Sequence, residues 1–102
     1  MHVIASATIR QFADKHKSAG ASLLSWLRIV EQAAWNSIAD VQLVFPHADT
    51  VKVGSGKNVV IFNVKGNAYR LITAIHFNRG KVYVLRLLTH AEYDKDKWKT
   101  QL

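Results

Sequence analysis

The 102-residue chain contains no cysteine and a single proline. Without a thiol it cannot form disulfides, Cys-ligated zinc sites or iron–sulfur clusters, and it has no cysteine nucleophile. No stretch approaches the roughly 20 apolar residues that span a bilayer. The first ten residues also lack the basic start and continuous apolar run of a secretory signal. These absences favour a soluble cytoplasmic protein without a Cys-ligated metal.

The length fits one domain, residues 1–102, with one modest core, and it argues against two-domain cofactor enzymes, so we expect no cofactor. Hydrophobic residues make up 49% and charged residues 21%, which is typical of a folded globular chain. The formal net charge is +7. Residues 1–49 are neutral, whereas residues 50–102 carry ten Lys and Arg against three acidic residues. This asymmetry favours a polyanion partner, nucleic acid first, although a basic surface kept for solubility has the same composition.

The hydrophobic pattern changes period halfway along the chain. Apolar residues recur at helical spacing in the first half, and β-branched and aromatic residues alternate in the second. We expect helices at 6–16, 21–34 and 37–45 and strands at 2–4, 51–53, 59–64, 69–77 and 81–88. Tight turns join the later strands into an antiparallel meander. The predicted fold class is α+β, with N-terminal helices packed on one face of a twisted antiparallel sheet and a short C-terminal helix.

Short polar motifs predict where three helices begin. Ser6 is a candidate N-cap for the first helix. Ser37 with Asp40 resembles a capping box, and Thr89 with Glu92 forms one at the start of the terminal helix.

Alternation along the strands predicts which side chains share a face of the sheet. In residues 69–77, Arg70 and His76 fall on the side opposite the mainly apolar residues that should pack on the helices. In the preceding strand, Asn63 and Lys65 share one side. Arg70 and His76 should therefore look away from the helices.

The last strand and the terminal helix extend this polar surface. Alternate residues of the last strand share one side: Val82, Val84, Arg86 and Leu88. One consistent register gathers four basic side chains on the sheet face that helices do not cover: Lys65, Arg70, His76 and Arg86. The terminal helix then presents residues three or four apart along one face at the rim: His90, Tyr93 or Asp94, and Lys97.

A face with Arg, Lys, His and Tyr suits cleavage of RNA, because RNA carries its own nucleophile, the 2′-OH. Cleavage needs a base for that hydroxyl, a cation for the developing phosphate charge and an acid for the leaving oxygen. Imidazole titrates near neutrality. A guanidinium stays charged and can donate two parallel hydrogen bonds to phosphate oxygens. Each residue also has a purely structural interpretation: a surface cation, a solvated helix end, a satisfied sheet histidine or a tyrosine at the core edge.

Two segments together resemble a known family: residues 62–72, Phe-Asn-Val-Lys-Gly-Asn-Ala-Tyr-Arg-Leu-Ile, and residues 89–95, Thr-His-Ala-Glu-Tyr-Asp-Lys. They resemble the HigB-type toxins of bacterial type II toxin–antitoxin systems, within the RelE/ParE-like superfamily, and the similarity covers nearly the whole chain. The resemblance implies one RelE-like domain acting as an mRNA interferase, a ribosome-dependent, metal-independent endoribonuclease that cuts translated mRNA. It also implies neutralisation by a HigA-like helix-turn-helix antitoxin, and an indirect association with operator DNA through that antitoxin. It implies no membrane partner.

The resemblance carries three residues over as catalytic. Arg70 matches the strand arginine that contacts the scissile phosphate, and His90 and Tyr93 match terminal-helix positions where related toxins place a catalytic His or Tyr. Six further residues are candidate RNA contacts: Asn63, Lys65, His76, Arg86, Lys95 and Lys97. The strand before Arg70 has fewer cations than in better-studied relatives, and the general base stays open between His90, Glu92 and Tyr93.

A second class of function fits the same fold. ParE-like relatives inhibit gyrase, so the alternative is a non-cleaving, toxin-like module that binds gyrase, the ribosome or RNA. Trp26 and Trp35 are candidates for the antitoxin interface if they are exposed, and core residues if they are not.

Overall fold

The computed structural model describes residues 1–102. Five strands form one sheet in the order β1-β5-β4-β3-β2. Their bounds are β1 His2–Ile4, β2 Asp49–Lys52, β3 Asn58–Val64, β4 Tyr69–His76 and β5 Lys81–Thr89. Adjacent strands run antiparallel, except that β1 pairs parallel to β5. The prediction of a wholly antiparallel sheet is wrong for β1, because short turns set the direction of the later strands whereas most of the chain separates β1 from β5.

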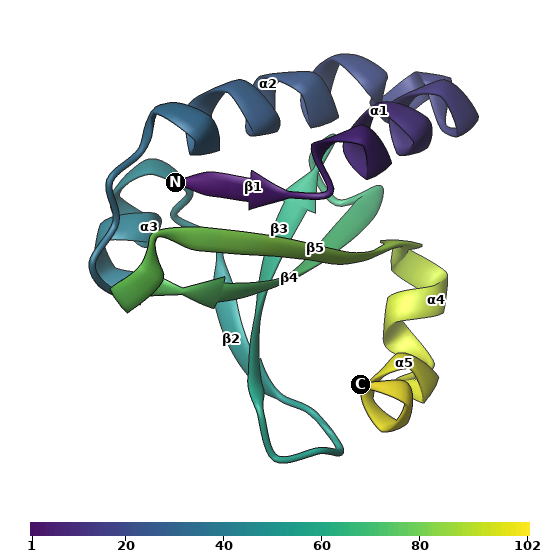
Figure 1. Cartoon of the computed structure of the whole chain (residues 1–102). Coiled ribbons are helices and arrows are strands. Elements are labelled where there is room, and N and C mark those ends of the chain that lie inside the picture. Colours follow the sequence, from purple (N-terminus) through teal and green to yellow (C-terminus); the bar gives the residue numbers. More distant parts are fainter.

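Three helices come before the meander: α1 Ser6–Lys15, α2 Gly20–Gln32 and α3 Ile38–Val44, with a short 3₁₀-helix at Lys17–Ala19. α1 and α2 lie across one face of the sheet (Figure 1). They form there because their apolar residues recur at helical spacing and turn towards the sheet. No helix of the chain has both the length and the apolar character needed to cross a membrane.

The predicted cap at Ser6 is wrong, and Ser37 stands at the N-cap of α3 as predicted but forms no capping box. Ser6 is the first residue inside α1, after Ala5 in a left-handed conformation with φ 67°, and no side chain caps this helix. The carboxylate of Asp40 does not pair with Ser37 but accepts a hydrogen bond from the backbone N–H of Asn36 at 2.8 Å. A polar side chain near a helix start has several backbone donors within reach, and the path of the preceding loop decides which one it meets.

The main core fills the space between α1, α2, α3 and the sheet. Phe62 of β3 is fully buried at its centre. Its ring meets those of Trp26 at 5.4 Å, Phe45 at 5.1 Å and Trp35 at 6.5 Å between centroids. Trp26 and Trp35 are both buried, so their interpretation as core residues is confirmed.

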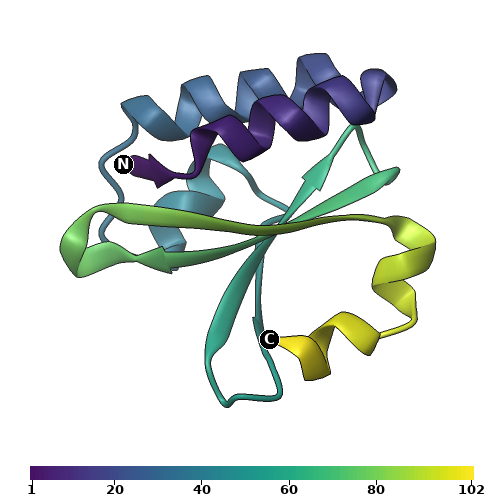
Figure 2. The ribbon, with the colours of Figure 1, turned by 45° about the vertical axis from the view of Figure 1, so that its right-hand side comes forward.

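A second, smaller core lies on the opposite face of the sheet and consists of Val53, Val59, Ile61, Ile72 and Trp98. Trp98 comes from α5, Lys97–Gln101, which follows α4, His90–Asp94, after a break at Asp96 with φ 59°. Figure 2 shows α4 and α5 on the other side of the sheet from α1 and α2. The prediction of one terminal helix at the rim of an uncovered face is therefore wrong, because burial of Trp98 folds the chain back under the sheet.

A bulge in β5 decides which way Arg86 faces. Ile72 pairs with Arg86, but the next residue of β4 pairs with Val84, so Leu85 is extra. Val84 packs on the main core, whereas Arg86 shares the face of its partner, opposite the helices. Strict alternation, which puts Val84 and Arg86 on one side, is wrong, but Arg86 still lies on the face of Arg70 as predicted.

Candidate active site

Arg70 lies near the start of β4, with Asn63 of β3 opposite it on one side and Leu88 of β5 on the other. Its Nη1 donates to the carbonyl oxygens of Asn67 at 3.1 Å and Tyr69 at 3.2 Å. Neither of the two ion pairs of the chain includes this guanidinium. A half-buried cation that no carboxylate neutralises can bind a phosphate with its remaining N–H donors.

Tyr93 of α4 lies against this guanidinium. The Cζ atom of Arg70 is 5.6 Å from the centroid of the Tyr93 ring, which is a cation–π contact. The Tyr93 ring also stacks on Trp98, with centroids 5.2 Å apart, and the indole Nε1 donates to the Tyr93 carbonyl at 3.0 Å. Burial raises the pKa of the Tyr93 phenol above its ordinary value of 10.0. The phenol therefore keeps its proton near neutral pH and can donate a hydrogen bond or a proton.

Trp98 holds Tyr93 in place, so its removal should unfold this end of the molecule first. We expect Trp98→Ala to lower the free energy of unfolding by about 3–5 kcal/mol, because it deletes a buried aromatic side chain. Trp98→Phe keeps a stacking ring and loses only the indole N–H, so we expect a smaller loss of about 1 kcal/mol from that hydrogen bond plus a packing term. Urea unfolding followed by circular dichroism measures both. An unfolding midpoint for Trp98→Ala equal to that of wild type would contradict this account of the second core.

His90 begins α4 and is held at two points. Its backbone N–H donates to the carbonyl of Ala68 at 3.0 Å, which ties α4 to the β3–β4 turn. Its Nδ1 lies 2.8 Å from Oδ2 of Asp94, one helical turn further on, and both side chains are about half exposed. A carboxylate at Nδ1 orients an imidazole, so that Nε2 is the ring nitrogen that can exchange a proton. No group of three or more His, Cys, Asp or Glu side chains is placed to hold a metal ion.

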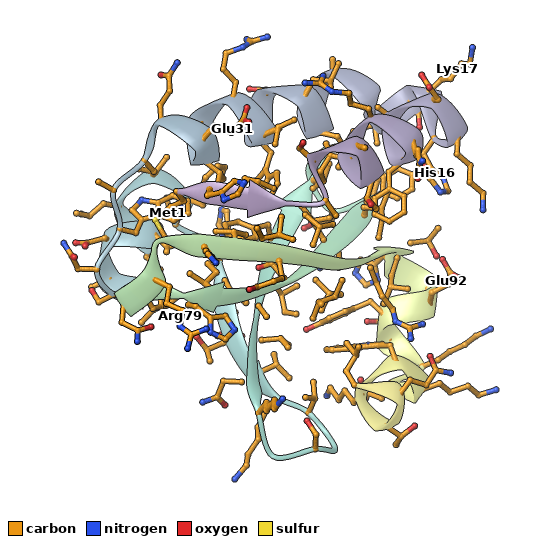
Figure 3. All side chains as sticks on the ribbon, viewed as in Figure 1. Met1, His16, Lys17, Glu31, Arg79 and Glu92 are labelled. Atoms are coloured by element: carbon orange, nitrogen blue, oxygen red, sulfur yellow. The ribbon has the colours of Figure 1, made fainter.

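The predicted capping box at the start of α4 is confirmed. Thr89 Oγ1 accepts from the backbone N–H of Glu92 at 3.2 Å, and Glu92 Oε1 accepts from the backbone N–H of Thr89 at 3.0 Å. The hydrogen bond from the Thr89 backbone is the main reason why the pKa of Glu92 lies below its ordinary value of 4.5. His16, the residue that follows α1, adds a smaller attraction, and Figure 3 shows His16 and Glu92 at the same end of the molecule.

This capping box makes part of the stability depend on pH. Glu92→Gln keeps an acceptor for the Thr89 N–H but removes the charge, so we expect it to cost about 0.3–1 kcal/mol at pH 7. The contribution of a carboxylate with a lowered pKa is fully present above about pH 4.5 and is lost as the pH falls through the lowered value. Thermal unfolding of both proteins from pH 7 to pH 3 measures the difference. A difference that stays constant over this range would show that the Glu92 charge does not stabilise the helix start.

The stretch from residue 19 to residue 96 matches the family model for HigB_toxin, the RelE-like toxic component of a toxin-antitoxin system. The chain belongs to the HigB toxin family. The match includes β3, β4, β5 and α4, and with them Arg70, His90 and Tyr93. The resemblance predicted from the sequence is confirmed at this level, and so is the RelE-like α+β fold.

Curated HigB proteins resemble the chain over nearly its whole length. "mRNA interferase HigB" of Escherichia coli O6:H1 (strain CFT073) is 28% identical over 95 residues, which are 93% of this chain and 90% of that protein. "mRNA interferase toxin HigB" of Escherichia coli K12 is 29% identical over 94 residues, 92% of this chain and 88% of that protein. Each of these alignments therefore covers most of this chain and most of the relative.

The other predicted RNA contacts of this HigB-family toxin lie at different distances from Arg70. Asn63 is directly opposite Arg70 in the register. The strand ends at Val64 as predicted, so Lys65 lies exposed in the turn with φ 53°, and grouping it with the strand residues of one face is wrong. His76 shares the face of Arg70 but lies six residues further along β4, roughly 20 Å away, with its ring against Tyr83 at 5.1 Å. His76 is therefore not part of the cluster around Arg70.

The two lysines of the terminal segment are separated from one another by the helix break. Lys95 follows α4 and Lys97 opens α5, and both are exposed. The continuous face expected from His90 through Lys97 is interrupted at Asp96. The sequence analysis missed Trp98, although it is the one large apolar residue in the charged stretch 94–99, and that isolation was the available signal.

Proposed function

We propose that this toxin is an mRNA interferase, an endoribonuclease that cleaves translated mRNA on the ribosome and does not need a metal ion. The observation that carries the proposal is the guanidinium of Arg70, which no carboxylate neutralises and which lies on the ring of Tyr93. An unneutralised arginine beside a tyrosine fits a phosphodiester, because the guanidinium can bind the phosphate oxygens while the phenol hydroxyl donates to a neighbouring oxygen. The printed names of the curated relatives support the same activity.

His90 is the general base of the proposed reaction. The two other candidates suit the role less well: the Glu92 carboxylate has a lowered pKa and serves the helix cap, and the Tyr93 phenol has a raised pKa and keeps its proton. The imidazole of His90 has a carboxylate at Nδ1 and is about half exposed. Nε2 takes the proton of the 2′-OH, which then attacks the adjacent phosphorus.

Arg70 and Tyr93 complete the step. Attack by the 2′-oxygen forms a bond to phosphorus, and the bond from phosphorus to the 5′-oxygen of the next nucleotide breaks. Arg70 stabilises the added charge on the phosphoryl oxygens in the transition state. The Tyr93 hydroxyl donates its proton to the leaving 5′-oxygen, so the products are a 2′,3′-cyclic phosphate and a 5′-hydroxyl.

The remaining polar residues bind RNA away from the reacting bond. In this proposal four cations and one amide contact the RNA: Asn63, Lys65, Arg86, Lys95 and Lys97. His76 contacts RNA or ribosome only beyond this cluster, because it lies at the other end of β4. The antitoxin partner implied by the family is, in this proposal, a HigA-like helix-turn-helix protein that blocks the toxin and links it to operator DNA.

Translation of a reporter mRNA in a purified system, followed by mapping of RNA 3′ ends, tests the proposal. We expect cuts inside translated codons that appear only when ribosomes are present. Blocked translation with intact mRNA would show that the protein is a non-cleaving inhibitor and not a nuclease. Unaffected translation would direct the search to gyrase and other targets.

A further inference from the structure

A pocket of about 610 Å³ lies at the end of β4 that is far from Arg70. We call it the Tyr83 pocket. Its lining includes three apolar residues and three polar ones: Val59, Ala74 and Leu85, and Lys57, His76 and Tyr83. Its volume is typical of sites that hold a small ligand, and a nucleobase is a ligand of that size. The proposed cleavage chemistry uses none of these residues.

The tertiary fold fixes two walls of this pocket, the β2–β3 loop and the end of α5. The backbone N–H of Gly54 in the loop donates to the carbonyl oxygen of Lys99 at 2.8 Å. A Cβ atom at position 54 would lie 3.1 Å from that oxygen, so a glycine allows the two segments to approach this closely. Leu102, which follows α5, also lines the pocket, and Figure 2 shows the C-terminal end beside the β2–β3 loop. The pocket is therefore already formed in the free protein.

Two aromatic rings form one side of the pocket. The rings of His76 and Tyr83 meet edge to face, with centroids 5.1 Å apart, and both are accessible to solvent. In the register His76 pairs with Lys81 and Tyr83 pairs with Ala74. Alternation along β4 and this pairing place all four residues on the sheet face of Arg70. Accessible rings beside an apolar floor suit an unpaired RNA base, because every base has a face that can stack.

The surroundings of the pocket are cationic. The stretch 50–91 contains seven Lys and Arg and no acidic residue, and no acidic side chain lines the pocket. Neither Lys57 nor Lys81 belongs to an ion pair. Arg86 lies on the same face, in the register between the pocket and Arg70. Cations thus follow one face of the sheet from the proposed cleavage site to the pocket, which suits the phosphates of a single RNA strand.

We propose that the Tyr83 pocket binds a base of the mRNA that is being cut, a few nucleotides away from the cleaved bond. The base stacks on Tyr83 and His76, and Lys57 and Lys81 meet the phosphates on either side of it. The pocket lies roughly 20 Å from Arg70 along β4, so the nucleotide next to the cut cannot reach it. This subsite rests on the proposed function, because it requires mRNA at Arg70.

The occupant is RNA and not an acidic peptide, because the strands at the pocket offer no free edge. β4 has β3 on one side and β5 on the other. The first three residues of β5, Lys81 to Tyr83, also pair with β1. An extended peptide would therefore find no backbone groups to pair with, whereas stacking on rings and contact with cations need none.

Cleavage kinetics on translating ribosomes test the subsite. Tyr83→Leu removes the ring and keeps an apolar side chain, and we expect it to raise KM about 10-fold with kcat unchanged, because a contact far from the reacting bond holds substrate and transition state equally. Lys57→Ala, at an exposed position, should raise KM about 3-fold. Lys52→Ala is the matched control: it removes an exposed charge from the same hairpin, between Val51 and Val53, which pack on the second core, so Lys52 points to the other face. Its KM should equal that of wild type, and wild-type KM values for Tyr83→Leu and Lys57→Ala as well would overturn the subsite.

Photocrosslinking identifies the occupant. Messenger RNAs that carry a photoreactive thiouridine at successive positions beside the cut are loaded on ribosomes with the His90→Ala toxin, irradiated, and the crosslinked toxin peptides are sequenced by mass spectrometry. We expect crosslinks to Tyr83 or His76 from a position a few nucleotides from the cut and none from the nucleotide next to it. Raised KM values without these crosslinks would mean that the pocket contacts the ribosome, and would overturn binding of the mRNA base.

The same experiments separate failure of the subsite from failure of the proposed function. If wild type cleaves mRNA but the pocket variants keep its KM, the subsite is wrong and the nuclease stands. If wild type cleaves no mRNA on ribosomes, the proposed function is wrong, and the subsite is wrong with it.

Discussion

Replacing Arg70 by alanine should lower the rate of mRNA cleavage by about 100- to 1,000-fold, the usual cost of removing one preorganised donor to a developing oxyanion. The reason is that Arg70 alone combines a central strand position, an aromatic support and no neutralising carboxylate. Its charge is therefore available to the transition state. The measurement is the cleavage rate on translating ribosomes at saturating toxin.

A matched control for this variant lies at the other end of the same hairpin. Arg79 is exposed in the short 3₁₀-helix Phe77–Arg79 between β4 and β5, and Figure 3 shows it at the end of the molecule opposite Glu92. Arg79→Ala removes the same charge and should cleave at nearly the wild-type rate. Arg70→Lys keeps the charge but loses the paired N–H donors of the guanidinium, so its cleavage rate should lie between those of Arg70→Ala and Arg79→Ala. Equal cleavage by Arg70→Ala and Arg79→Ala would remove Arg70 from the site.

Loss of His90 should have an effect at least as large. His90→Ala removes the proposed general base, and proton transfer by a positioned side chain is worth about 100- to 10,000-fold in rate. The limb of the pH–rate profile that reports the base should also disappear. Measuring cleavage over a range of pH with wild type and variant checks both expectations.

Asp94 distinguishes a catalytic His90 from a structural one. Asp94→Asn keeps an oxygen near Nδ1 but removes the charge that stabilises a protonated imidazole. We expect a smaller loss of rate than for His90→Ala, with unchanged urea unfolding. If His90→Ala cleaves normally, the base must be sought elsewhere. A loss of activity in step with a loss of stability would show that His90 only anchors α4.

The sequence alone predicted the parts of this fold that local chemistry decides. Alternating β-branched residues on either side of short turns predict β3, β4 and β5, because neighbours joined by tight turns can only run antiparallel. The Thr89–Glu92 box predicts the start of α4, because its four atoms lie within four residues. Arg70 stands out for a similar local reason: an arginine flanked by apolar strand residues is costly to bury unpaired. Asn63 follows from its parity in the preceding strand.

Only the tertiary structure decided how these pieces meet. The bulge at Leu85 sets the direction of Arg86, and no local pattern marks which residue of a strand is extra. Burial of Trp98 against Ile61 and Ile72 folds α4 and α5 under the sheet and brings Tyr93 onto Arg70. That contact joins residues 23 positions apart, and its free energy comes from packing that no local periodicity encodes. The local sequence thus determined which side chains the site contains, and long-range burial determined which of them touch.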